Sequence, residues 1–212
     1  MRNVIAIIAI LGLFAVVPAM AATCPGTVVF HDDFTTLNPT LNAETTAGSK
    51  VTVQGEKAEI TFLKVPMARA MEYQGTQYGD GSVCLTVTPL ASDKAEDQTA
   101  GIIFWASDLN NFYVFQVQVN GSFCVSQLSL NGTWTFAVPW QTSAATKQGV
   151  GVANTLRVQT AGITATLFIN DQQVGTFTGT PPGGTSQVGF YAGSSTKTAV
   201  TWDVSDLSVT KP

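Results

Sequence analysis

Aromatic side chains and hydrogen-bonding side chains occur close together in the middle of the sequence. Trp105 and Tyr113 flank a loop that contains Asp108 and Asn111, and a further indole follows at Trp140. An aromatic face can stack on the C–H face of a sugar ring, while carboxylate and amide groups bind sugar hydroxyls. These five residues are therefore the candidate ligand-binding residues, with Trp105 and Trp140 as the stacking groups. The competing interpretation is that the rings fill a hydrophobic core.

Hydrolytic chemistry would have to use very few titratable side chains. His31 is the only histidine, and no G-x-S-x-G motif precedes a predicted helix, so the sequence does not indicate a Ser-His-Asp triad. A glycosidase needs two carboxyl groups about 5 to 9.5 Å apart. Asp32 and Asp33 are adjacent and, in a strand, point to opposite faces. We therefore assign no catalytic residue, and we expect Asp33 to hydrogen-bond the loop that contains Thr35.

Metal binding is restricted to oxygen ligands. A site with nitrogen ligands lacks a second histidine, and the three cysteines contain no C-x-x-C pair. Asp203, Asp206, Asp32 and Asp33 would meet if the first and last strands are neighbours, and oxygen ligands alone suit calcium. The simpler interpretation is that these carboxylates are solvated. We therefore expect no cofactor, with a structural calcium ion as the alternative.

The composition excludes several classes of protein. Of the 212 residues 45% are hydrophobic and only 11% are charged, so the chain can bury a sizeable core and is not of the disordered type. The formal net charge of −4 shows no basic excess. Nucleic-acid binding proteins need such an excess to neutralise phosphates, so a nucleic-acid partner is not expected.

Residues 1–22 have the features of a secretory signal peptide. Arg2 supplies the positive end, Val4–Val17 is a nearly continuous apolar run, and Ala19-Met20-Ala21 matches the A-x-A cleavage pattern. The apolar run is shorter than the roughly 18 residues that a membrane anchor requires. We therefore expect a secreted or periplasmic protein without a membrane anchor, whose mature chain keeps 9 basic and 14 acidic residues.

Alternation with period two dominates residues 23–212, which we interpret as a single domain. Lys57–Phe62 and Val83–Thr88 place apolar residues on one face and polar residues on the other, as half-buried strands do. Asn120-Gly121 and Asn131-Gly132 predict hairpin turns in which both residues have positive φ. No segment shows sustained helical spacing with caps. The pattern predicts an all-β, antiparallel β-sandwich of roughly a dozen strands.

The last predicted strand contains a break in its alternation. Trp202 and Val204 share one parity, whereas Leu207 and Val209 have the opposite parity. Both pairs can face the core only if the strand carries a bulge, which we place near Ser205-Asp206. Trp202 is accordingly predicted to be a core residue.

Four segments carry a resemblance to a known group of folds. They are VVFHDDF, AGIIFWASDLNNFYVFQV, NTLRVQTAGITATLFINDQQVGTF and VGFYAGSSTKTAVTWDVSDLSV. Together they resemble a concanavalin A-like (laminin G-like) jelly roll and, more narrowly, bacterial secreted domains known as 3-keto-disaccharide hydrolase-like. The similarity covers most of residues 27–211 and implies that the final strand returns beside the first. These motifs are structural, so they predict fold better than function.

The resemblance does not extend to the catalytic motif of the enzymes on this fold. Laminarinase-type glycosidases carry E-x-D-x-E on one strand, which places three carboxylates on the same face. None of the five glutamates of this chain forms that motif: Glu44, Glu56, Glu59, Glu72 and Glu96. Enzymatic activity is therefore not favoured, although it stays open.

The three cysteines of an exported chain are expected to form one disulfide and leave one thiol free. In the domains that this sequence resembles, a cysteine before the first strand and another after the D-G turn occur together. The resemblance thus implies a disulfide between Cys24 and Cys84, with Cys124 free. Such a bond would also tether the start of the chain, which otherwise frays.

Three functions compete at this point. We favour a lectin-like module whose partner is a carbohydrate or glycan. The alternatives are a hydrolase acting on 3-keto-disaccharides or related glycosides, and a non-catalytic structural or adhesive envelope protein; the oligomeric state is open. An exposed row of aromatics on one sheet face would favour the first function, and a deep pocket with a buried, pKa-shifted carboxylate the second. A flat polar face with a self-complementary edge would favour the third.

Overall fold

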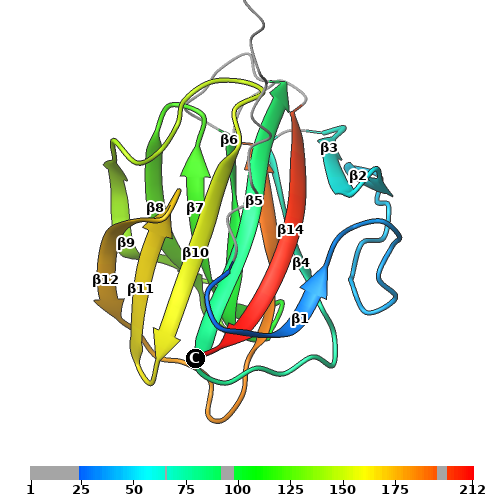
Figure 1. Ribbon diagram of the computed structural model, residues 1–212. Helices are drawn as coiled ribbons and strands as arrows, with labels where there is room; N and C mark the ends of the chain where they lie inside the picture. The colour runs from blue at the N-terminus through cyan, green and yellow to red at the C-terminus, as the bar shows by residue number, and fades with distance from the viewer. Residues whose placement is uncertain (1–23, 65, 92–97, 195–199) are drawn as a thin grey trace, which may run out of the picture.

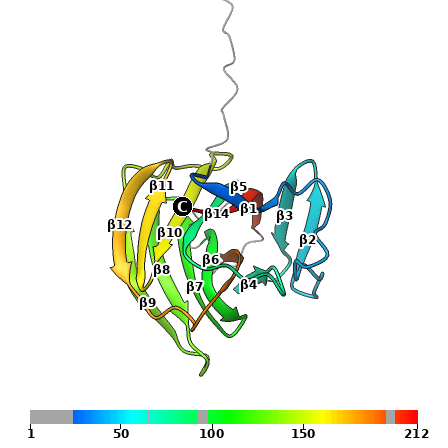
Figure 2. The same cartoon turned by 60° about the horizontal axis from the view of Figure 1, so that its bottom comes forward.

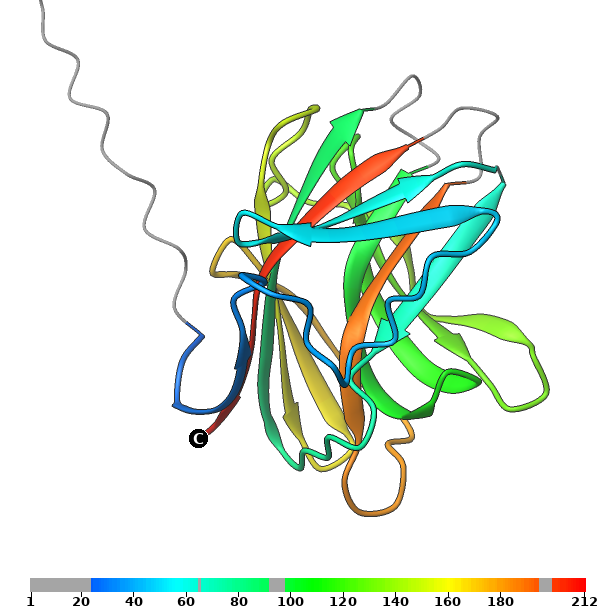
Figure 3. The ribbon, with the colours of Figure 1, turned by 90° about the vertical axis from the view of Figure 1, so that its right-hand side faces the viewer.

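The computed structural model describes residues 24–64, 66–91, 98–194 and 200–212. Fourteen strands in these ranges form two antiparallel sheets that pack face to face as a β-sandwich, which confirms the predicted fold class. Figure 1 views the sandwich with the eight-stranded sheet in front. Figure 3 shows most of that sheet on the left, with β2 and β3 (cyan) crossing in front, and the six-stranded sheet on the right. The described residues contain no helix.

The eight-stranded sheet has the order β12-β11-β10-β5-β14-β3-β2, with β1 paired to β14. Its strands are β1 (Thr27–Asp32), β2 (Ser49–Gln54), β3 (Lys57–Phe62), β5 (Gly81–Ala91), β10 (Asn154–Ala161), β11 (Thr164–Ile169), β12 (Gln172–Thr178) and β14 (Thr201–Lys211). The six-stranded sheet has the order β4-β13-β6-β7-β8-β9. Its strands are β4 (Met67–Glu72), β6 (Gln98–Asp108), β7 (Asn111–Gln118), β8 (Ser122–Leu128), β9 (Trp134–Thr142) and β13 (Gln187–Ser194).

The core lies between the two sheets because each sheet presents one apolar face to the other. In β11 the alternation is complete: Ala165, Leu167 and Ile169 are buried in the core, while Thr164 and Thr166 are not. The largest of the fully buried side chains are aromatic: Trp202, Tyr73, Phe34, Phe62, Phe104, Phe112, Phe115, Phe123 and Phe190. Most of these rings belong to the face of a sheet that points toward the other sheet. The fold is therefore stabilised by burial of apolar side chains and needs few charged residues.

The predicted bulge in the last strand is present. The register of β14 against β5 shifts between Ser205 and Ser208, and Asp206 has a φ of 57°. This extra residue lets Trp202 and Leu207, which have opposite parity, both face the core. The pairing of β14 with β1 confirms that the first and last strands are neighbours.

The two Asn-Gly turns differ from the prediction. Only the glycines, Gly121 and Gly132, have positive φ, at 90° and 76°. Asn120 Oδ1 instead accepts a hydrogen bond from the Ser122 amide at 2.9 Å, and Asn131 Oδ1 accepts one from the Thr133 amide at 3.0 Å. The expected pair of positive φ angles was therefore wrong: each turn is a three-residue loop that ends in a glycine bulge.

The disulfide between Cys24 and Cys84 is confirmed. Their Cα atoms lie 5.7 Å apart, and the bond joins the segment before β1 to the middle of β5. Cys124, the remaining cysteine, is free and buried. Cys84 points away from the core because its neighbours Val83 and Leu85 face it, so the disulfide lies on the outer side of the eight-stranded sheet.

The four aspartates that could have formed a calcium site each have a separate partner. Asp33 accepts hydrogen bonds from the Thr35 amide at 2.9 Å and from its hydroxyl at 2.8 Å, which confirms its predicted role. Asp32 accepts from the Tyr73 hydroxyl at 2.9 Å. The other two form ion pairs at 3.0 Å, Asp206 with His31 and Asp203 with Lys57. Within the described ranges, no three metal-binding side chains lie together.

The predicted signal peptide lies outside the described residues, which begin at Cys24. Within the part of the chain that is described, no helix has the length and apolar character needed to cross a membrane.

Candidate functional site

The outer face of the six-stranded sheet, meaning the face turned away from the other sheet, carries a continuous set of side chains. The strand register places Tyr191 beside Gly101, Gly101 beside Gln116, and Gln116 beside Cys124. A neighbouring row runs from Gly193 through Thr99 to Gln118. Each row therefore crosses several strands and mixes glycines with amide and hydroxyl groups.

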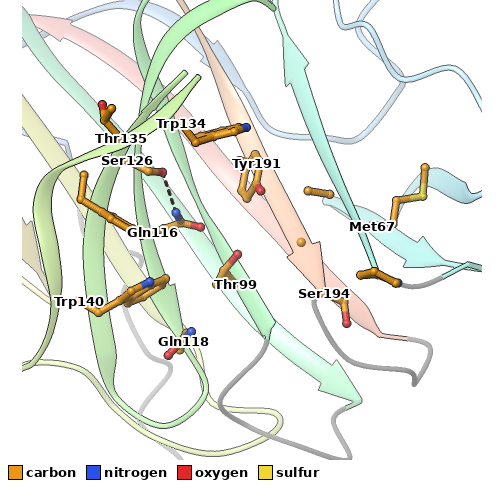
Figure 4. A pocket seen from close by; sticks show the side chains of 14 residues that line it. Met67, Thr99, Gln116, Gln118, Ser126, Trp134, Thr135, Trp140, Tyr191 and Ser194 are labelled. Carbon is orange, nitrogen blue, oxygen red and sulfur yellow. Dashed lines mark hydrogen bonds between the residues drawn. The ribbon is translucent and has the colours of Figure 1, made fainter. Parts of the chain in front are cut away.

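The edge strand β9 adds aromatic side chains to this face. Two register shifts interrupt its pairing with β8, and they turn Val138 toward the core. Trp134, Phe136 and Trp140 stay on the outer face, where they border one groove (Figure 4). The hairpin that joins β8 to β9 extends beyond the sheet at the right of Figure 3 (yellow-green). The two bulges thus separate a core residue from three exposed aromatic residues within one strand.

The groove has a volume of about 640 Å³. Aromatic rings stand along it, and hydroxyl and amide groups lie between them (Figure 4). Trp134 is 46% exposed and Trp140 is 36% exposed, which is high for indole rings. The lining residues are Pro66, Met67, Ala68, Thr99, Gln116, Gln118, Ser126, Trp134, Thr135, Phe136, Trp140, Tyr191, Gly193 and Ser194.

The floor of the groove is polar but carries no formal charge. Gln116 donates a hydrogen bond from Nε2 to Ser126 Oγ at 2.9 Å, which orients its amide within the floor (Figure 4). Among the described lining residues none is Asp, Glu, Lys, Arg or His. Gly101 lies between Tyr191 and Gln116 in the strand register, and glycine is needed there because a Cβ would come within 1.9 Å of the Phe115 carbonyl oxygen.

Tyr191, which lines the groove, and the buried Cys124 of the same sheet stay neutral over a wide pH range. Burial, together with the nearby Cys124 thiol, raises the pKa of Tyr191 to about 12. Burial likewise raises the pKa of Cys124 to about 12. Tyr191 therefore keeps its hydroxyl proton at neutral pH and can act as a hydrogen-bond donor.

Trp134 marks the boundary between the open groove and a closed apolar region. Its ring contacts Phe112 at a centroid distance of 5.7 Å and Tyr191 at 6.1 Å, both edge-to-face. Beneath it, four residues form a second small hydrophobic cluster: Ile103, Ala106, Phe112 and Val114. These contacts hold the Trp134 ring in one orientation while nearly half of its surface remains accessible.

The structure does not bring the five sequence-predicted residues into one site. Trp105 and Tyr113 are 5% and 3% exposed and belong to the core, on the opposite side of the sheet from Trp140. The two rings contact each other, with centroids 5.4 Å apart. A bulge at Trp105, where φ is 46°, turns its side chain inward. Asp108 accepts a hydrogen bond from the Asn110 amide at 2.6 Å and thereby shapes the turn before Asn111.

Sequence reasoning identified Trp140 but missed most of the groove. Trp134 and Phe136 share the parity of Trp140, but so does Val138, which faces the core, so the two bulges of β9 make parity an unsafe signal here. Gln116 and Gln118 also share a parity within β7. Tyr191 belongs to a strand far away in the sequence, so only the sheet order reveals that it faces the same groove.

A buried carboxyl group lies on the same sheet but outside the groove lining. Glu72, the last residue of β4, is 5% exposed, and its Oε2 has no hydrogen-bond partner among the described residues. Burial raises the pKa of Glu72, and the negative charge of Asp108 raises it further. Such a group is favoured in its neutral, protonated form.

No family model and no curated protein matches the chain. Several solved structures are similar in fold. One is the carbohydrate-binding module CBM66 from Bacillus subtilis, with a TM-score of 0.54 and 12% identity over 89% of this chain and 100% of that chain. Another is a β-glucanase from Bacillus licheniformis, with a TM-score of 0.63 and 11% identity over 88% of this chain and 99% of that chain. A laminarinase from Flavobacterium sp. UMI-01 is also similar (TM-score 0.62, 11% identity, 87% and 100%). The chain therefore has the concanavalin A-like jelly-roll fold.

Proposed function

We propose that this chain is a secreted or periplasmic lectin-like module that binds an uncharged polysaccharide in the outer-face groove. One observation carries the proposal. Trp134, Trp140 and Tyr191 stand around a floor of amide and hydroxyl groups, with no charged side chain among the described lining residues. This combination provides stacking surfaces together with neutral hydrogen-bonding groups, which is what a neutral sugar chain requires.

The chemistry of the floor favours a ligand rich in hydroxyl groups. Each glutamine amide offers donors and an acceptor, and each hydroxyl group can do both. A sugar hydroxyl is also both donor and acceptor, so it can match either kind of group. An anionic polysaccharide would instead need a cation to compensate its charge when it is desolvated. The groove therefore suits neutral glycans better than uronates or sulfated glycans.

Two further findings support this proposal. Several solved proteins of similar fold are described as a carbohydrate-binding module or as glucanases, although their low sequence identity carries only the fold. The disulfide between Cys24 and Cys84 is typical of oxidising compartments, which supports export.

The test is binding of the purified mature domain to a panel of neutral and anionic polysaccharides by affinity electrophoresis and calorimetry. Trp140→Ala and Trp134→Ala should each weaken binding by about 5- to 150-fold, by analogy with the 1 to 3 kcal/mol of base stacking on aromatic rings. Trp140 is partly exposed, so its removal should leave the melting temperature nearly unchanged.

Leu130→Ala is the matched control. Leu130 is 72% exposed and belongs to the same β8–β9 hairpin, but it does not line the groove. Its truncation should leave binding unchanged. If the parent binds no polysaccharide, or prefers anionic ones with Trp140→Ala equal to the parent, the proposal is wrong. The structural or adhesive function would then be the leading hypothesis.

The hydrolase acting on 3-keto-disaccharides remains a second candidate because of Glu72. This carboxyl group has the burial and the raised pKa of a general acid, and Asp108 supplies a second carboxylate in its electrostatic environment. Incubation with 3-keto-disaccharides and chromatographic detection of released monosaccharide tests this function. Product formation by the parent that is lost in Glu72→Gln would establish it.

A further inference from the structure

A second pocket lies at the end of the sandwich that is drawn at the bottom of Figure 1 and brought forward in Figure 2. Three connections form it: the loop before β5, the turn between β10 and β11, and the loop 179–186 between β12 and β13. We call it the end pocket. Its volume is about 320 Å³, half that of the groove and at the lower end of the range for small-molecule sites.

The connections around the end pocket are joined to one another. Tyr78 and Ser186 exchange two backbone hydrogen bonds of 2.8 Å, which link the first loop to the third. The Gly162 amide donates to Asp80 Oδ2 at 2.9 Å and links the first loop to the turn. The Thr180 amide donates to the Tyr113 hydroxyl at 3.0 Å, which anchors the third loop to the core. A pocket fixed in this way loses little conformational entropy on binding.

The lining of the end pocket is amphipathic. Trp105 lines the pocket although only 5% of this residue is exposed, and Tyr78, Ile163 and two prolines supply further apolar surface. Asp80 is the charged residue among the described lining residues. Its carboxylate can accept bonds from two adjacent hydroxyls, because the Gly162 amide occupies only one of its lone-pair positions.

We propose that the end pocket is a second binding site that takes a single sugar residue, such as a glycan terminus. The ring presents its C–H face to the apolar side and its hydroxyls to Asp80. This proposal does not depend on the groove, because the two sites share no lining residue. The groove is open and suits an internal segment of a chain, whereas the smaller end pocket suits one residue. A glycan could then be held at two places on one domain.

Gly79 allows the pocket to be blocked cleanly. Gly79 lines the pocket and a Cβ there would meet nothing within 4 Å, so Gly79→Leu adds a bulky side chain at the pocket without displacing backbone. Asp80→Asn is the second variant, because an amide oxygen still accepts the Gly162 hydrogen bond while the charge is removed. Trp140→Ala is the matched control, since it alters the groove and leaves the end pocket intact.

The experiment is titration of the ¹⁵N-labelled mature domain with methyl β-glucopyranoside, methyl β-galactopyranoside and methyl α-mannopyranoside, followed by amide chemical shifts. We expect at least one probe to shift the amides of Gly162, Gly184 and Ser186 with a dissociation constant of about 1 mM or weaker, because one ring buries few atoms. Gly79→Leu and Asp80→Asn should weaken this binding by about tenfold or more. Trp140→Ala should leave it unchanged.

Polysaccharide binding to the groove separates the two proposals. Gly79→Leu should bind the polysaccharide as the parent does, so loss of one site does not imply loss of the other. The end-pocket proposal is overturned if no glycoside shifts these amides, or if the shifts persist in Gly79→Leu. It is also overturned if tetramethylammonium, a cation that suits an aromatic site beside a carboxylate, shifts them and the glycosides do not.

Discussion

At the scale of single residues, two tryptophans of the same sheet have opposite environments. Trp105 was expected to stack on a ligand, but a bulge with positive φ turns it into the core, where 5% of it is exposed. Trp140 follows one bulge of β9, lies within the second and remains 36% exposed on the other face. A one-residue bulge reverses the side of a sheet on which all following side chains lie. The type of residue therefore did not distinguish a ligand contact from a core contact here.

Glu72 provides a prediction at this scale. An acid whose folded-state pKa is raised holds its proton more tightly when folded. Below the unfolded pKa of about 4.3 the carboxyl group is protonated in both states and does not oppose folding. As the pH rises from there through the raised folded-state pKa, the cost of ionising the buried carboxyl group lowers the stability of the fold. Glu72→Gln removes this penalty. It should therefore raise the melting temperature at about pH 7 and change it little at about pH 4.

Thermal unfolding from about pH 4 to pH 8 measures this effect. Glu56→Gln is the control, because Glu56 is exposed in a turn and its replacement should change stability equally little at both ends of the range. A melting temperature of Glu72→Gln that falls below the parent at neutral pH would show that the ionised carboxylate stabilises the fold.

At the scale of elements, the two-residue turn between β2 and β3 has positive φ at both central residues, which is the geometry that was wrongly expected of the Asn-Gly turns. Between β2 and β3, Gly55 and Glu56 have φ angles of 60° and 63°, as a type I′ turn requires. A non-glycine residue in this region costs about 1 to 2 kcal/mol, which exceeds the entropic cost of glycine. Glu56→Gly should therefore stabilise the protein by roughly 0.5 kcal/mol in denaturant unfolding.

Two companion variants define the origin of that gain. Glu56→Ala keeps a Cβ at the same φ and should bring no comparable stabilisation. Gly55→Ala introduces strain without a clash, since a Cβ there meets nothing within 4 Å, and should destabilise by about 1 kcal/mol. Equal stability of Glu56→Gly and Glu56→Ala would contradict the assignment to backbone strain.

The edge strand β9 bears on the choice between a binding module and an adhesive protein. It is exposed along nearly its whole length and carries three large aromatic residues. Pro139 has no amide hydrogen, and two bulges interrupt the regular ladder, which are features that protect edges from pairing with other strands. Its exposed aromatics are therefore better suited to a ligand than to strand addition.

At the scale of the whole molecule, the disulfide and the groove belong to different sheets. The bond between Cys24 and Cys84 closes a separation of 60 residues on the outer side of the eight-stranded sheet. In the chain-entropy model its loss costs about 4 kcal/mol. A Cys24→Ser, Cys84→Ser double variant should show that loss in denaturant unfolding and should still bind polysaccharide with the affinity of the parent.

Reduction of the parent provides the comparison for this variant. Cys124 is already a free thiol, so a reductant breaks the Cys24–Cys84 bond alone and should reproduce the behaviour of the double variant. Loss of polysaccharide binding in the folded double variant would instead show that the two sheets are coupled.

The sequence by itself determined the fold class and the bulge of β14, because these follow from local patterns. Alternation with period two reports which residues face a core, and a change of parity between Trp202 and Leu207 requires an extra residue. The pairing of Cys24 with Cys84 also came before the structure, from the resemblance to other secreted domains.

Only the tertiary structure decided where the candidate site lies. The groove joins Tyr191 of β13 to Gln116 of β7 and Trp140 of β9. These strands alternate with β6 and β8 in the six-stranded sheet, and only the order of that sheet brings them to one groove. Parity within one strand cannot tell which of its two faces meets the core, nor which distant strand lies beside it. That choice depends on packing the two apolar faces together, which is a property of the whole chain.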